Sequence, residues 1–230
     1  MSYPENPETI VLKNRFYSRG MSEKNLYDYY QKIRGPLIEQ VKGRDVMFAI
    51  LAGLNKPILK RKASGKFIIL TPSNYDKIIT GRTISVYSTM KYYEDIAIVD
   101  IDADNFEQSK QPTLDVYNAL NGANFIRDLS IRYTGKTGFH IFCEIVRKTK
   151  IDSARLLLEQ YLLTKKEVTS QYTIAAKRTK GIPNIDLWAS NKKNGAFISL
   201  HSLSIIGLRC MKVQPTQLQS FRPEQARIRF

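Results

Sequence analysis

The hydrophobic pattern of the chain switches repeatedly between the period of a helix and the period of a strand. After Ser22, apolar side chains recur at the helical spacing i, i+3, i+4 and i+7, at Leu26, Tyr29, Tyr30 and Ile33. Serine favours the N-cap position, so a helix is expected to begin directly after Ser22. Short apolar runs predict strands, at 46–51, 67–70, 83–87, 98–102, 130–133, 139–145, 185–188, 196–200 and 208–213.

Two more helices are expected in the second half of the chain. A loop is predicted at 110–113, and Pro112 stands where a following helix can start. A leucine-rich helix is predicted from Asp152 or Ser153 to roughly Glu167. Residues 214–230 have little apolar periodicity and are expected to form a peripheral tail.

The order of these elements predicts an α/β protein of the α+β type, with a mixed, largely antiparallel sheet flanked by helices. The 230 residues are enough for a substantial core, and we treat 1–230 as a single domain. Its approximate lobes are 1–90 and 91–213, followed by the tail. The smaller N-terminal lobe is expected to complete a cleft.

The strand at 98–102 carries two aspartates inside an apolar frame. Because side chains alternate along a strand, Asp100 and Asp102 share one face. Two adjacent carboxylates repel each other unless a cation lies between them. Mg²⁺ and Mn²⁺ prefer such oxygen ligands, so this pair predicts a metal-dependent phosphoryl or nucleotidyl transfer site. Asp104 has the spacing of the same strand face and is an alternative third ligand, but Asp104 and Asn105 are interpreted as the turn that follows the strand.

The net charge is the strongest indication of a binding partner in the overall composition. The formal net charge of +15 favours a polyanionic partner, and nucleic acid ranks above an anionic membrane because no basic amphipathic helix stands out. No apolar run is long enough to span a membrane, and the first residues lack the layout of a secretory signal. An intracellular protein is therefore expected, with Cys143 and Cys210 as reduced core residues and no structural zinc site.

Three further segments carry candidate chemistry. In the glycine turn at 134–140, Gly135 and Gly138 allow close backbone approach, and Lys136 and His140 can neutralise a phosphate. Asp186, on the strand at 185–188, is a candidate to join Asp100 and Asp102 around two metal ions. Basic residues are weaker candidates for nucleic-acid contacts, at Lys60, Arg61, Lys62, Lys192, Lys193 and Arg209.

In their order along the chain, these segments resemble the motifs of the archaeo-eukaryotic primase superfamily. The motifs are DID at 100–102, TGKTGFH at 134–140, Asp186, and Ser199-Leu200-His201. The resemblance covers about residues 96–213, and residues 22–30 with 43–46 look like the start of the polymerase domain of bacterial ligase D, a repair branch. Thr134 stands where the superfamily usually has Ser, and Ala196-Phe197 stand where many members carry a basic residue.

The resemblance implies a primase-polymerase that adds nucleotides to a DNA or RNA primer on a DNA template and uses Mg²⁺ or Mn²⁺. Asp100, Asp102 and Asp186 would hold the metal ions. Nucleoside triphosphate would be bound by Thr134, Gly135, Lys136, Gly138, His140, Ser199 and His201. Alternatives are a gap-filling or end-joining polymerase without priming activity, a non-catalytic nucleic-acid-binding accessory protein, and a metal-dependent nuclease.

Overall fold

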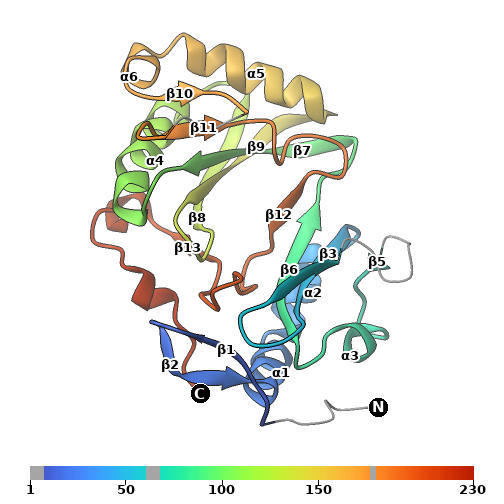
Figure 1. The fold of residues 1–230 in the computed structure, drawn as a ribbon. Coiled ribbons are helices and arrows are strands. Elements are labelled where there is room, and N and C mark those ends of the chain that lie inside the picture. Colours follow the sequence, from blue (N-terminus) through green and yellow to red (C-terminus); the bar gives the residue numbers. More distant parts are fainter. Residues whose placement is uncertain (1–7, 61–67, 177–179) are drawn as a thin grey trace. The chain divides into compact units, whose positions relative to one another are not determined.

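The computed structural model describes residues 8–60, 68–176 and 180–230, which form two compact units (Figure 1). The first unit contains residues 1–89, 197–210 and 223–230, and the second contains 90–196 and 211–222. Each unit therefore draws on chain segments that are far apart in the sequence. Two of the weak nucleic-acid candidates, Arg61 and Lys62, lie outside the described residues.

The first unit combines two small sheets with short helices. Its elements are β1 (Ile10–Asn14), β2 (Tyr17–Ser22), α1 (Glu23–Lys32), α2 (Arg34–Val41), β3 (Asp45–Leu51), β4 (Pro57–Lys60), β5 (Ile68–Ile69), α3 (Tyr75–Ile78), β6 (Thr83–Thr89), β12 (Ala196–Ile198) and the 3₁₀ helix η2 (Pro223–Ala226). β1 pairs with β2, and the larger sheet has the order β12-β6-β3-β4, with β5 also paired to β3.

The helix predicted after Ser22 is confirmed as α1. The Ser22 hydroxyl accepts a hydrogen bond from the backbone N–H of Asn25, and the Asn25 side chain accepts one from the backbone N–H of Ser22. This reciprocal capping box satisfies two backbone donors that a helix start otherwise leaves open. The buried Tyr30 hydroxyl donates to the carbonyl of Ile84 and so ties α1 to β6.

The second unit is built on one six-stranded sheet. Its elements are β7 (Tyr93–Asp102), α4 (Phe106–Leu120), β8 (Ile126–Tyr133), β9 (Phe139–Lys150), α5 (Ile151–Leu163), α6 (Lys166–Thr169), β10 (Thr173–Ile174), β11 (Asn184–Asp186), β13 (Met211–Val213) and η1 (Pro215–Gln217). The strand order is β10-β11-β7-β9-β8-β13, and β10 with β11 is the parallel pair among antiparallel ones. The predicted fold class, mixed and largely antiparallel, is confirmed.

One face of this sheet is the apolar core of the second unit. The ring of Phe106, at the start of α4, lies 5.5 Å from Tyr133 and 5.7 Å from Phe139, centroid to centroid. Phe221, from the segment predicted as a peripheral tail, is 5% exposed and packs 5.1 Å from Tyr133. Because side chains alternate along β7, β8 and β9, Asp100, His140 and Arg132 point to the opposite face.

Two helix boundaries were predicted wrongly. The loop expected at 110–113 is part of α4, which begins at Phe106 because the Asn105 side chain accepts a hydrogen bond from the Gln108 N–H and caps the helix. Pro112 lies inside this helix. The next helix, α5, is preceded by Lys150 with no side-chain cap, and it ends at Leu163 before the separate α6.

Both cysteines are reduced and buried, as predicted. Burial raises the pKa of the Cys143 thiol, so this side chain behaves as a small apolar core residue. In the described part of the chain, no helix is both long and apolar enough to cross a membrane.

Candidate active site

Strand pairing places the predicted acidic residues side by side. β7 lies between β11 and β9, and Asp100 is directly opposite Asp186 on one side and His140 on the other. The row continues through Arg132 on β8 to Lys212 on β13. We call these five residues the charged row. Residues directly opposite in a ladder have Cβ atoms about 4.5–5.5 Å apart and point to the same face.

The charged row changes sign across the sheet. Two carboxylates lie at the β11 and β7 end, and two cationic side chains lie at the β8 and β13 end. Between them, Nε2 of His140 lies 3.3 Å from Oδ1 of Asp100, with the His140 side chain 9% exposed and that of Asp100 22% exposed. The guanidinium carbon of Arg132 lies 3.5 Å from the ring centroid of Phe142. This face therefore carries negative charge at one end and positive charge at the other.

Asp186 is held by the backbone that follows it. Its Oδ1 accepts hydrogen bonds from the N–H groups of Trp188, at 2.6 Å, and Ala189, at 3.0 Å. Both bonds go to the same carboxylate oxygen, and Asp186 is 8% exposed. These bonds fix the direction of the side chain.

The glycine turn packs against the end of β7. A Cβ on Gly138 would lie 2.4 Å from the carbonyl oxygen of Ile101 and 3.9 Å from Oδ1 of Asp102, so only glycine fits there without displacement. Gly135 has a φ of 82°, a value that glycine adopts without strain. The Thr134 hydroxyl donates to the Gly138 carbonyl at 3.0 Å and closes the turn, while Lys136 is exposed.

Sequence reasoning missed Asn191, which anchors the aspartate strand. Its Oδ1 accepts from the backbone N–H of Ile98 at 2.8 Å, and its Nδ2 donates to the carbonyls of Ile98 and Leu187. Ile98 is two residues before Asp100, so this buried amide ties the β7 backbone to the segment after β11. An asparagine shortly after a strand is too common a pattern to mark this role in advance.

Sequence reasoning also missed Asn184, which is opposite Asp102 in the ladder and on the same face as Asp186. Asn184 is 1% exposed, and its Oδ1 is a buried oxygen that has no hydrogen-bond partner among residues 8–60, 68–176 and 180–230. This amide oxygen and the neighbouring carboxylates are oxygen ligands of the kind that Mg²⁺ and Mn²⁺ prefer. Among the described residues, however, no group of three or more His, Cys, Asp or Glu side chains is arranged so that it could hold a metal ion. The metal-binding roles of Asp100, Asp102 and Asp186 stay predictions.

Ser199 and His201 belong to the first unit. The Ser199 hydroxyl lies 2.9 Å from that of Ser88, and both are buried. His201 has a φ of 69°, unusual for a residue other than glycine, and its carbonyl accepts a hydrogen bond from the Tyr29 hydroxyl. Burial raises the pKa of Tyr29, which keeps this donor protonated. Their predicted nucleotide-binding role stays a prediction.

The basic candidates are spread over both units. Lys192 and Lys193 are exposed in the segment between β11 and β12, in the second unit. Arg209 belongs to the first unit, where its backbone N–H bonds to the Ala226 carbonyl. Lys60 is the last residue of β4. Their predicted contacts with nucleic acid stay predictions.

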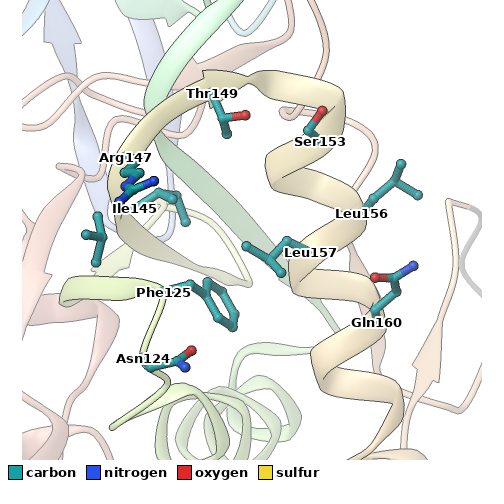
Figure 2. Close-up of a pocket in the computed structure, with 10 residues that line it drawn as sticks. Asn124, Phe125, Ile145, Arg147, Thr149, Ser153, Leu156, Leu157 and Gln160 are labelled. Atoms are coloured by element: carbon teal, nitrogen blue, oxygen red, sulfur yellow. The ribbon is translucent and has the colours of Figure 1, made fainter.

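A separate groove of about 650 Å³ lies beside α5. Figure 2 shows Leu157 of α5 facing Phe125, with Ile145 of β9 nearby. Ile145 is five residues after His140, so strand alternation puts it on the opposite face of β9 from the charged row. The groove is therefore distinct from the candidate active site.

No protein-family model matches the chain, and no curated protein matches its sequence. The fold, however, resembles that of a solved polymerase domain. The structure is similar to the polymerase domain of Mycobacterium tuberculosis ligase D in complex with DNA, with a TM-score of 0.78 and 11% sequence identity. The match covers 96% of this chain and 90% of the other. At this identity the likeness establishes the fold, and it agrees with the branch that the first lobe of the sequence resembles.

Proposed function

We propose that the protein is a nucleotidyltransferase that extends a primer on a nucleic-acid template, as a DNA primase or polymerase. The observation that carries the proposal is the charged row. Asp100 and Asp186 are paired on adjacent strands, Asp102 shares their face, and His140 and Arg132 continue the row. These residues lie on a fold similar to that of a DNA polymerase domain. The net charge of +15 suits a nucleic-acid substrate.

In this proposal, Asp100, Asp102 and Asp186 would hold Mg²⁺ or Mn²⁺, which would supply positive charge for the oxygens of phosphoryl transfer. The protein groups provide orientation and charge. His140, whose Nε2 lies 3.3 Å from Oδ1 of Asp100, can donate a ring N–H to a phosphate oxygen. Lys136 at the exposed tip of the glycine turn adds positive charge for the triphosphate. Lys192 and Lys193 are candidates to contact the nucleic-acid backbone.

Primer extension tests the proposal. The purified chain is incubated with a labelled primer on a longer template, Mn²⁺, and either ribo- or deoxyribonucleoside triphosphates. Extension is expected, and Asp100→Asn should lower its rate on the order of 10³-fold, as the removal of a major electrostatic contribution does. Asp95→Asn is the matched control, because Asp95 is exposed near the other end of the same strand.

Each other outcome points to a different function. Products from an unprimed template would add priming activity, and products from a primed template alone would favour a gap-filling or end-joining polymerase. The similarity to a ligase D domain favours the second form. Tight template binding without any product would refute catalysis and support an accessory protein. Template degradation that needs no nucleotide would indicate a nuclease.

A further inference from the structure

In the part of the chain that the structure describes, a buried amide beside the carboxylates has an oxygen with no hydrogen-bond partner. Asn184 is 1% exposed, and its Nδ2 donates to the carbonyl of Ala175 at 2.9 Å. This bond fixes which end of the amide is the oxygen, and it turns Oδ1 away from Ala175. Burying a carbonyl oxygen without a donor costs free energy, so a native protein normally supplies a water or an ion at such a place.

Two residues beside Asn184 on the same face offer acceptors instead of donors, and the hydroxyl of Thr173, opposite Asn184 on β10, does not bond to Oδ1. Asp102 is opposite Asn184 in the ladder, and Asp186 is two residues along the same strand. Ionised carboxylates cannot donate a hydrogen bond to the amide oxygen. A divalent cation satisfies both kinds of group, because Mg²⁺ and Mn²⁺ accept carboxylate and amide carbonyl oxygens as ligands.

We infer that Oδ1 of Asn184 is an additional ligand of the divalent cation that Asp100, Asp102 and Asp186 hold; the inference rests on the proposed function. An amide contributes an oxygen without adding negative charge. The site then holds its cation while leaving more of the positive charge to act on substrate phosphates. The hydrogen bond to Ala175 keeps Asn184 oriented for this role before the cation binds.

Metal binding tests the inference without relying on catalysis. Free Mn²⁺ is measured by electron paramagnetic resonance during titration of the protein, for the wild type, Asn184→Leu, Asn184→Asp and Asp100→Asn. Asn124→Asp is the control for added charge, because Asn124 is exposed beside the separate groove. Circular dichroism and thermal unfolding without metal check that each variant folds.

Asn184→Leu has nearly the same size but no oxygen, so it should weaken Mn²⁺ binding about 10-fold or more. Asn184→Asp should bind Mn²⁺ more tightly than the wild type, and Asn124→Asp should not. Affinities of both Asn184 variants equal to that of the wild type would overturn the inference and leave Oδ1 with a water. If Asn184→Leu does not fold, the increase in unfolding temperature on addition of Mn²⁺ is compared between Asn184→Asp and the wild type. An increase in Asn184→Asp that is no larger than in the wild type overturns the inference.

The same titration separates this inference from the proposed function. Wild-type protein that binds no Mn²⁺, or binds it equally well with Asp100→Asn, contradicts the metal site itself. Binding that needs Asp100 but is insensitive to residue 184 contradicts only the role of Asn184.

Discussion

Gly138 shows how closely the glycine turn is fitted to the aspartate strand. Its Cα faces the carbonyl of Ile101, the residue between the two aspartates of β7. The turn thereby brings Lys136 and His140 to the end of the strand that carries Asp102. A side chain at position 138 has to push the turn and β7 apart.

Gly138→Ala is therefore expected to destabilise the protein by about 1–3 kcal/mol, as overpacking does, and to lower nucleotide addition more than stability alone explains. Urea unfolding and primer extension measure the two effects. Gly53→Ala is the matched control, because a Cβ there meets nothing within 4 Å. An unchanged Gly138→Ala variant would mean that the turn and the strand are not held together.

At the level of residues, the sequence showed which side chains are charged, but not which residues they pair with in the sheet. The alternation of Asp100 and Asp102 was readable from the strand period alone. The pairing of Asp186 with Asp100 depends on which strands are neighbours, and a local pattern does not contain that information. Asn184 and Asn191 were missed for the same reason, because an amide is identified by its partners and not by its spacing.

At the level of elements, β7 is positioned from both sides of its backbone. It pairs with β9 and β11, and Asn191 adds a side-chain clamp on both the N–H and the carbonyl of Ile98. This clamp is buried, so water cannot replace it. The geometry of the carboxylates depends on this clamp as well as on the sheet.

Asn191→Leu should lower the free energy of unfolding by about 1–3 kcal/mol, because the Ile98 N–H loses its partner in the interior. Chemical denaturation measures this loss. Asn124→Leu, at an exposed position, should leave stability nearly unchanged. Equal stability of the two variants would contradict the role assigned to Asn191.

Helix α1 gives a prediction on alkaline pH. Burial raises the pKa of Tyr30 and of Tyr75, whose hydroxyl donates to the Tyr30 carbonyl. The folded protein keeps these phenols protonated, while the unfolded chain loses their protons near a pKa of about 10. Their contribution to stability is complete below that pH and falls as the pH rises above it.

The urea midpoint should therefore drop between about pH 8 and about pH 11. Tyr30→Phe should show a smaller drop, because one of the titrating groups is gone. A midpoint that falls equally in both proteins would assign the alkaline loss to other groups.

Of the helix caps, the one at Ser22 was predicted correctly, the one at Asn105 was interpreted as a turn, and the one expected at Asp152 or Ser153 does not begin α5. Ser22 and the apolar spacing after it located α1. Pro112 suggested a helix start, but the Asn105 cap sets the beginning of α4 six residues earlier. Tertiary packing tolerates the proline inside the helix.

At the scale of the whole molecule, the chain combines a polymerase-like fold with a strong positive charge. The fold class was predictable because apolar runs of strand length alternate with helical periods. The return of the chain to the first unit was not, because residues 197–210 and 211–222 belong to different units. A return of the chain to an earlier unit depends on contacts between distant segments, which short-range sequence patterns do not reveal.

The charge predicts that nucleic-acid binding weakens steeply with salt. Fluorescence anisotropy with a labelled primer–template should give a linear fall of the logarithm of affinity with the logarithm of KCl concentration. Replacing Lys192 and Lys193 by Ala should reduce the slope by about one unit for each phosphate that the protein no longer neutralises. Lys24→Ala, which removes a lysine paired with Asp28, is the control. A salt-independent affinity would contradict a phosphate-backbone interface.

The central claim is that Asp100, Asp102 and Asp186 meet around divalent cations on one face of the sheet. Crystals soaked in Mn²⁺ and measured at a wavelength where manganese scatters anomalously test it directly. The account predicts an anomalous peak within about 2–2.6 Å of oxygens from these side chains. A map without a peak there, or a structure with the Asp186 carboxyl more than about 10 Å from the other two, would contradict it.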